Sequence, residues 1–195
     1  MSEYPTHRLF LVRHGQTEWS VSGKHTGTTD IPLTDPGRET ARELRPRLEG
    51  REFATVLSSP MSRARETCDL AGFGDRAELT EDLLEWNYGD YEGRKTVDIR
   101  KERPGWTLWD DSAPNGETAD EVGARVDRVI ERIRAADGDA IVFAHGHLLR
   151  VLTARWLGLD PRMGRLLWLT TGTLCVLGYE REIAVLKLWN DGADI

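Results

Sequence analysis

The sequence has no long hydrophobic run. Its longest apolar stretches, such as residues 9–12 and 140–144, are far shorter than the roughly 20 residues that a membrane-spanning helix needs. The N-terminal residues Ser2, Glu3 and Tyr4 do not form a basic region followed by a hydrophobic one, so a secretory signal is not expected. We therefore expect a soluble, cytoplasmic protein with no membrane partner.

Cysteine is also scarce, and acidic residues outnumber basic ones, 33 to 26. Cys68 and Cys175 are the 2 cysteines of the chain, and their wide separation without Cys-x-x-Cys spacing argues against a disulfide framework or a thiolate zinc site. We expect both to be reduced and buried. The formal net charge of -7 argues against nucleic acid as a partner, because nucleic-acid binding favours a basic face. A local basic pocket remains compatible with this charge.

The length and composition fit one globular domain. The chain has 195 residues, of which 39% are apolar, and the apolar residues are spread along its whole length. There are no internal repeats and no low-complexity segments. We expect a single domain that spans residues 1–195.

Short apolar runs alternate with amphipathic segments, which predicts an α/β fold. A helix should start at residues 34–37 and present Leu44 and Leu48 on one face. Strands are expected at 9–12, 53–57 and 139–144, further helices at 60–71, 117–136 and 146–157, and a closing hairpin that pairs 173–177 with 184–189.

Residues 89–116 interrupt this regular alternation. The segment contains Pro104, Pro114 and 4 glycines, together with Trp106 and Trp109. Such a composition predicts a long loop or lid between two more regular parts of the same domain.

Histidines follow two of the predicted strands. Arg13-His14-Gly15 comes directly after one strand, and His145-Gly146 comes after another. Because open α/β sheets bind ligands at the carboxyl ends of their strands, we expect the two histidines to converge on one ligand. Glycine lets the backbone approach an anion, and the helix expected after Gly146 should direct its free N–H groups at a phosphate.

Two alternatives compete with this interpretation. Either histidine alone could be an ordinary hydrogen-bonded residue at a strand end. His14, His145 and His147 could also form a metal cluster, but no acidic ligands occur at matching spacing. We therefore expect no metal and no cofactor.

Phosphoryl transfer requires fixed positive charge more than it requires covalent machinery. Arg13 and Arg63 can supply that charge, since Arg63 lies at the start of the helix that follows another strand. A neutral imidazole such as that of His14 can attack phosphorus directly. Glu85 is the best-placed candidate to protonate the leaving alcohol, with Glu92 and Asp90 as alternatives.

Five sequence elements together resemble the histidine phosphatase, or phosphoglycerate mutase-like, superfamily. They are LVRHGQTEWS at 11–20, HTGTTDIPLT at 25–34, SSPMSRARET at 58–67, LLEWNYGDYEG at 83–93 and FAHGHLLR at 143–150. They occur in the order typical of the family and cover most of the chain. The resemblance implies a three-layer α/β/α sandwich around a mainly parallel sheet, with a phosphoglycerate mutase-like arrangement.

The same resemblance implies roles for ten residues. His14 corresponds to the phosphorylated nucleophile, and Glu85 to the proton donor. Arg13, Arg63 and His145 correspond to the phosphate pocket. Residues at substrate-contacting positions are Gln16, Ser20, Thr26, Gly27 and Gly146, of which Ser20 stands where the mutases usually have Asn.

The region after Gly93 favours a phosphatase over a mutase. It lacks the Leu-Asn-Lys element and the Arg-Arg pair of the cofactor-dependent mutases and instead reads ERPGWTLWDDSAPNGET at 102–118. This segment resembles the sedoheptulose-bisphosphatase branch and bacterial acid phosphatases. We therefore expect hydrolysis of phosphomonoesters, with a small phosphorylated metabolite, and above all a sugar phosphate, as the substrate. A phosphoglycerate mutase and a catalytically silent phospho-ligand binding protein are the alternatives.

An apolar cluster near the C-terminus bears on assembly. Leu166, Leu167 and Trp168 are consecutive. If exposed, they are a candidate homodimer contact, whereas a position in the core is the alternative.

Overall fold

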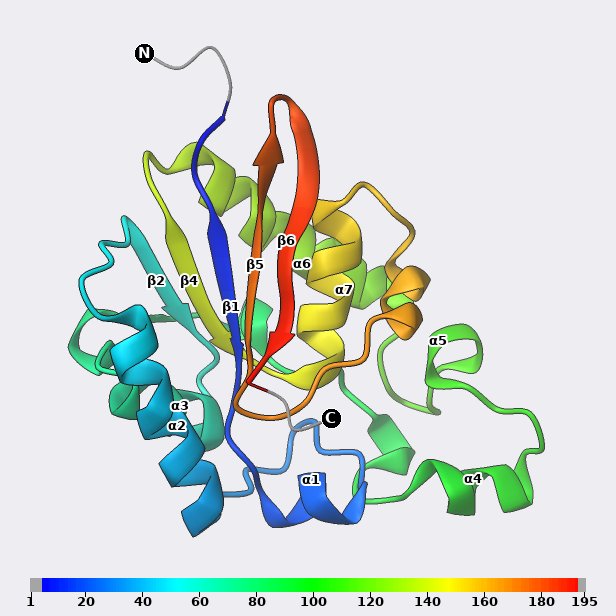
Figure 1. Cartoon of the computed structure of the whole chain (residues 1–195). Coiled ribbons are helices and arrows are strands. Elements are labelled where there is room, and N and C mark those ends of the chain that lie inside the picture. The colour runs from blue at the N-terminus through cyan, green and yellow to red at the C-terminus, as the bar shows by residue number, and fades with distance from the viewer. Residues whose placement is uncertain (1–4, 193–195) are drawn as a thin grey trace.

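A six-stranded sheet lies between two layers of helices in the computed structural model, which describes residues 5–192 (Figure 1). The strand order is β3-β2-β4-β1-β5-β6. Strands β3, β2, β4 and β1 are mutually parallel, whereas β5 and β6 run antiparallel to their neighbours. The strands are β1 (Leu9–Arg13), β2 (Thr55–Ser58), β3 (Glu78–Leu79), β4 (Ala140–Ala144), β5 (Leu174–Glu180) and β6 (Ile183–Asp191).

The longer helices cover the two faces of the sheet, as Figure 1 shows. Helices α2 (Asp35–Leu48) and α3 (Ser62–Leu70) lie on one face, and α6 (Ala119–Ala135) and α7 (Gly146–Trp156) on the other. This arrangement confirms the predicted α/β/α sandwich. Shorter α-helices are α1 (Glu18–Ser22), α4 (Thr96–Glu102) and α5 (Leu108–Asp111), and 3-10 turns occur at Gly74–Arg76, Glu81–Leu83, Gly89–Tyr91 and Pro161–Leu166.

Residues 9–12 of strand β1 are all apolar because both faces of the strand are covered. Leu9 and Leu11 belong to the core cluster that includes α6 and α7. Phe10 and Val12 point to the opposite face and pack in the cluster that includes α2 and α3. A strand buried on both faces reads as a continuous hydrophobic run, which explains its signal in the sequence.

Threonine caps fix the starts of α2 and α6. The Thr34 hydroxyl accepts a hydrogen bond from the Gly37 N–H at 3.2 Å. At α6, Thr118 and Glu121 form a reciprocal capping box. Such caps typically stabilise a helix by about 0.5–2 kcal/mol each, so they set where these helices begin.

The register of β1 and β4 brings the two histidine elements together. The strands pair in parallel with Val12 opposite Phe143 and Arg13 opposite Ala144. The next residues, His14 and His145, therefore leave the sheet side by side at its carboxyl edge.

Several elements differ from expectation. Residues 89–116 contain the short helices α4 and α5, joined by irregular segments, and Trp106 and Trp109 are only 3% and 8% exposed in the main core cluster. A lid role for this segment stays a prediction. Helix α3 begins at Ser62, two residues after Pro60. Helix α1 and strand β3 were not predicted, because α1 buries none of its residues and β3 has only two, so neither produces a periodic pattern.

Other expectations concern cysteines, exposed apolar residues and membrane segments. Cys68 and Cys175 are buried free thiols, and burial raises the pKa of each to about 12.

Leu166 and Trp168 are 74% and 62% exposed, so they are not core residues, and the homodimer remains a prediction. Across residues 5–192, none of the helices combines the length and the apolar composition needed to cross a bilayer. Residues 2–4, used above to judge a secretory signal, lie outside the described range.

We predict that Gly37→Ala destabilises the protein. A Cβ at Gly37 would lie 2.3 Å from the Gln16 carbonyl oxygen, so the start of α2 or the loop after β1 must move. We expect the free energy of unfolding to fall by about 1–3 kcal/mol, measured by urea denaturation. Gly123→Ala in α6 is the matched control, because its Cβ would lie 3.3 Å from the Pro161 side chain and alanine favours the helix. Equal losses in both variants would contradict this account.

Candidate active site

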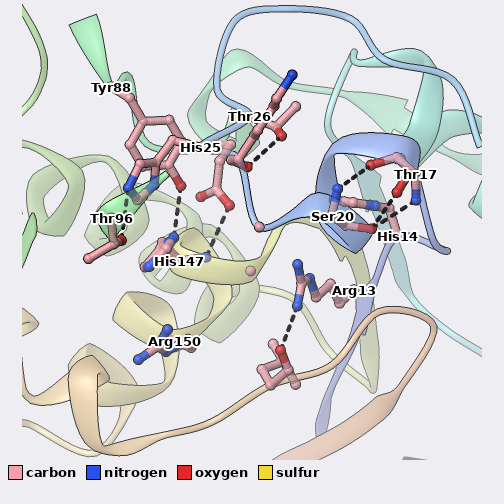
Figure 2. A pocket seen from close by; sticks show the side chains of 15 residues that line it. Arg13, His14, Thr17, Ser20, His25, Thr26, Tyr88, Thr96, His147 and Arg150 are labelled. Atoms are coloured by element: carbon pink, nitrogen blue, oxygen red, sulfur yellow. Dashed lines mark hydrogen bonds between the residues drawn. The ribbon is translucent and has the colours of Figure 1, made fainter. Parts of the chain in front are cut away.

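A cavity of about 250 Å³ opens at the carboxyl edge of the sheet (Figure 2). The predicted site residues that line it are Arg13, His14, Ser20, Thr26, Glu85 and Gly146. They come from β1, α1, the loops at residues 23–30 and 84–88, and the start of α7. The cavity therefore joins segments that are far apart in the sequence.

His14 is held as a neutral ring with a defined tautomer. Its side chain is buried, and its Nδ1 lies 2.7 Å from the Gly15 carbonyl oxygen. Because a carbonyl can only accept, Nδ1 carries the proton and Nε2 has a free lone pair. Burial, followed by the charges of Arg13 and Arg63, lowers the pKa of His14 well below its usual value. The ring is therefore unprotonated at Nε2 near neutral pH.

His145 lies beside His14 but behind the cavity wall. The two ring centroids are 5.2 Å apart. The His145 Nδ1 accepts a hydrogen bond from Arg63 Nε at 3.2 Å, so its proton is on Nε2, which donates to the Ser59 hydroxyl at 2.8 Å. Burial and then the charge of Arg63 lower the pKa of His145 well below its usual value. Both ring nitrogens are already occupied.

Arg63 is fully buried and binds backbone rather than lining the cavity. Its guanidinium donates to the carbonyl oxygens of Thr29 at 3.0 Å, Gly27 at 3.0 Å and Thr26 at 3.3 Å. These bonds fix the loop that carries Thr26 and bring a positive charge close to His14. The predicted direct contact between Arg63 and a phosphate stays a prediction.

Arg13 lines the cavity with unused donors. One Nη donates to the Leu169 carbonyl oxygen at 2.5 Å, whereas the buried Nε has no partner among the described residues. A Cβ at Gly146 would lie 3.1 Å from the Arg13 Cζ, so glycine at this position leaves room for the guanidinium. A buried cation with a free donor is well suited to hold an anion.

The Glu85 carboxylate occupies the start of α7. Its Oε1 accepts hydrogen bonds from the N–H groups of Trp86 and Leu148, both at 2.9 Å, and its Oε2 accepts one from His147 at 3.0 Å. Two of the N–H groups that we expected to face a phosphate therefore donate to a carboxylate. A carboxylate at a helix N-terminus is stabilised by the helix dipole, which explains the difference.

The other candidate acids lie elsewhere. Glu92 accepts hydrogen bonds from Gly27 N–H at 2.9 Å and Thr29 N–H at 3.1 Å. Asp90 is exposed and accepts a bond from the Asn115 side chain at 3.0 Å. Of these three carboxylates, Glu85 is the one that lines the cavity.

Of the five predicted substrate contacts, Gln16 and Gly27 lie off the cavity, and Ser20, Thr26 and Gly146 line it. The Gln16 side chain accepts a hydrogen bond from the Thr34 hydroxyl at 2.9 Å and lines a neighbouring groove. Gly27 is buried, and a Cβ there would lie 2.6 Å from the Trp86 carbonyl oxygen. Ser20 and Thr26 are on the wall, but Ser20 also caps α1 by accepting from the Thr17 N–H at 2.9 Å. Substrate contact by any of these residues stays a prediction.

Sequence reasoning missed or left unassigned much of the wall. His25, Tyr88, Thr96 and His147 lie together on one side of the cavity in Figure 2, with the Tyr88 hydroxyl 2.8 Å from His147 Nδ1. Burial lowers the pKa of His25 to about 4. The remaining cavity residues of this kind are Thr17, Gly23, Lys24, Arg150 and Leu169. Arg150 was detectable, because it lies one helical turn after Gly146.

The geometry gives no support to the metal-cluster alternative. The ring nitrogens of His145 bind Arg63 and Ser59, and His147 Nδ1 binds Tyr88. Within residues 5–192, no group of three or more His, Cys, Asp or Glu side chains is placed to hold a metal ion.

We predict that acidification from about pH 7.5 to about pH 5.5 destabilises the fold. His14 and His145 have lowered pKa values when folded, so the unfolded chain binds more protons below its own histidine pKa of about 6.5. Each histidine then reduces the free energy of unfolding by up to about 1.4 kcal/mol per pH unit. Urea denaturation across this range measures how the free energy of unfolding changes with pH, and His14→Asn should make this change smaller. If the free energy of unfolding does not change with pH over this range, His14 and His145 are not buried as neutral rings in the folded protein.

Known proteins resemble this chain along nearly its whole length. The sequence profile of the histidine phosphatase superfamily (branch 1) matches residues 9–192. The chain is 38% identical over 190 residues to an acid phosphatase of Mycobacterium tuberculosis, with 93% of each chain covered. It is 41% identical over 187 residues to a sedoheptulose 1,7-bisphosphatase of Saccharomyces cerevisiae, covering 79% of this chain and 69% of the yeast protein.

The solved structures agree with the sequences. The fold matches that of a Mycobacterium tuberculosis protein with a TM-score of 0.87 at 35% identity, covering 94% of this chain and 97% of the other. A profile that spans both histidine elements, together with this structural match, establishes that the chain belongs to the histidine phosphatase superfamily, branch 1.

Proposed function

We propose that this protein is a metal-independent phosphatase that hydrolyses phosphomonoesters in two steps through a phosphohistidine at His14. One observation carries the proposal. The neutral His14 ring has its Nδ1 proton fixed on the Gly15 carbonyl, which leaves the Nε2 lone pair available beside the Arg13 guanidinium. A nucleophile and an incompletely paired cation on one cavity wall are the two parts that phosphoryl transfer needs.

In the first step, His14 Nε2 attacks the phosphorus atom. The new N–P bond forms as the P–O bond to the alcohol breaks, and the bonding electrons leave with the ester oxygen. Arg13 and the nearby charge of Arg63 reduce the repulsion between the nucleophile and the phosphate oxygens. The hydrogen bond from Nδ1 to the Gly15 carbonyl stabilises the positive charge that develops on the ring.

Glu85 supplies the proton that the ester oxygen takes up. Its Oε1 already accepts two N–H bonds, whereas Oε2 accepts one, so Oε2 is the oxygen with room for a proton.

In the second step, water replaces the alcohol. The Glu85 carboxylate takes a proton from the water as the oxygen attacks phosphorus. The P–N bond breaks, its electrons return to His14 Nε2, and inorganic phosphate is released. One carboxyl group therefore acts first as the acid and then as the base.

The cavity wall favours a polar, anionic substrate such as a sugar phosphate. Thr17, Ser20 and Thr26 line the cavity with side-chain hydroxyls that also bond to backbone groups, and Lys24 and Arg150 add positive charge to the wall. Hydroxyl groups and cations match the hydroxyls and anionic groups of a phosphorylated sugar. The sedoheptulose 1,7-bisphosphatase from yeast, 41% identical, supports the same substrate class.

We predict that His14→Asn abolishes hydrolysis and phosphoenzyme formation. Removal of the nucleophile should reduce kcat by at least about a thousandfold, because the amide cannot accept the phosphoryl group. Mass spectrometry of enzyme quenched in alkali during turnover should show an added phosphoryl group in the wild type and none in the variant. His7→Asn is the matched control, since His7 packs against Trp156 and Tyr179 away from the cavity.

An assay of phosphate release separates the alternative functions. Phosphate release is measured with sugar mono- and bisphosphates, phosphoglycerates and an aryl phosphate, all with EDTA present. We expect full activity under these conditions, and loss of turnover on chelation would overturn the metal-free mechanism. Isomerisation of phosphoglycerate without phosphate release would establish a mutase, and binding without either reaction would establish a silent phospho-ligand protein.

A further inference from the structure

Arg125 of α6 binds the backbone of the chain segment that carries Glu85. Arg125 Nη1 donates to the carbonyl oxygens of Asp82 at 2.9 Å and Leu84 at 3.0 Å, and Nη2 lies 3.4 Å from that of Glu85. Arg125 therefore binds three backbone carbonyls within four consecutive residues.

Glu117 completes this attachment on the other flank. Its carboxylate accepts from Arg125 Nε at 2.7 Å and Nη2 at 2.9 Å, and also from the Asn87 N–H at 2.8 Å. Its backbone carbonyl accepts from the Trp86 indole N–H at 2.8 Å, and its N–H donates to the Asn87 carbonyl at 2.9 Å. The segment at residues 82–87 is thus tied on both sides to one ion pair.

The ion pair itself is largely withdrawn from water and from the cavity. The side chains of Arg125 and Glu117 are 15% and 22% exposed. Neither is among the residues that line the cavity, so neither can contact the substrate. Arg125 uses its forked donors in a fixed planar geometry that lysine cannot reproduce.

The nucleophile depends on different elements. His14 is fixed by β1 and the Gly15 carbonyl, and its neighbour Arg63 by α3 and the loop at residues 26–29. Loosening the segment at residues 82–87 therefore displaces Glu85 without displacing His14.

We propose, on the basis of the proton-donor role proposed above for Glu85, that Arg125 and Glu117 form a positioning clamp that sets the Glu85 carboxyl group at the leaving-group oxygen. The clamp acts on proton transfer and not on nucleophilic attack. Its loss should matter most for substrates whose leaving group requires a proton. Alkyl phosphates have such a leaving group, whereas p-nitrophenolate leaves as an anion.

The test compares kcat/KM for a sugar phosphate and for p-nitrophenyl phosphate, because kcat/KM reports the step that forms phosphohistidine. Arg125→Lys keeps the charge but loses the fork. Displacement of a catalytic group by about 1 Å can lower the rate about a hundredfold. We therefore expect the loss of kcat/KM to be at least about tenfold larger for the sugar phosphate than for the aryl phosphate. Glu117→Gln, which retains an oxygen to accept from the Asn87 N–H, should shift the ratio in the same direction and serves as a second variant.

Two variants make the outcome decisive. Glu85→Gln in the same assay tests the acid role itself. It should lower kcat/KM for the sugar phosphate by about a hundredfold or more, with a smaller effect on kcat/KM for the aryl phosphate. Arg128→Lys is the matched control, since Arg128 lies nearby on α6, is 57% exposed and binds the Asp82 carboxylate. It should leave the ratio unchanged.

The possible failures are distinguishable. The ratio is kcat/KM for the sugar phosphate divided by kcat/KM for p-nitrophenyl phosphate. If Glu85→Gln shifts this ratio but Arg125→Lys and Glu117→Gln lower kcat/KM equally for both substrates, the clamp is overturned and the phosphatase mechanism stands. If Glu85→Gln also lowers kcat/KM equally for both substrates, the acid role of Glu85 is wrong and the clamp proposal is wrong with it. Thermal unfolding of each variant shows that the folded protein was assayed.

Discussion

Positive charge without a tightly paired carboxylate is the constraint on which this site depends. Arg13 and Arg63 are held at the carboxyl edge of the sheet mainly by backbone carbonyls and, for Arg63, by the ring of His145. The half-exposed Asp30 carboxylate lies 3.8 Å from Arg63 Nη1, beyond hydrogen-bond distance. The charges of the two arginines help keep His14 neutral and reactive. A carboxylate bound directly to either arginine would cancel the field that a phosphate requires.

The carboxylates around the site are used for separate tasks. Glu92 fixes the loop that Arg63 also binds, Glu117 pairs with Arg125, and, of these three carboxylates, Glu85 is the one that lines the cavity. Each accepts hydrogen bonds from N–H groups, which help to define its position. Because Glu92 and Glu117 hold chain segments in place, the proposal gives the acid and base roles to Glu85.

The glycines near the site act mainly through packing. Gly146 leaves space for Arg13, and Gly15 and Gly37 allow the loop after β1 to contact the start of α2. At Gly15, an added Cβ would lie 2.3 Å from the Gly37 carbonyl oxygen. The carbonyl that fixes the His14 tautomer thus belongs to a residue that cannot enlarge without moving α2.

The sequence by itself determined the layer structure, the main strands and helices, and the position of His14 and His145 at the sheet edge, because periodicity, caps and strand-end motifs are local. It also singled out Glu85, which the structure places on the cavity wall, and the proton-donor role of Glu85 stays a prediction. Only the tertiary structure decided that Arg63 and His145 lie behind the wall, that Glu85 caps α7, and that Lys24, Tyr88 and Arg150 complete the cavity. These features depend on which donors and acceptors meet between segments far apart in the sequence, such as Arg63 and His145, 82 residues apart. A linear pattern does not encode the directions of those side chains.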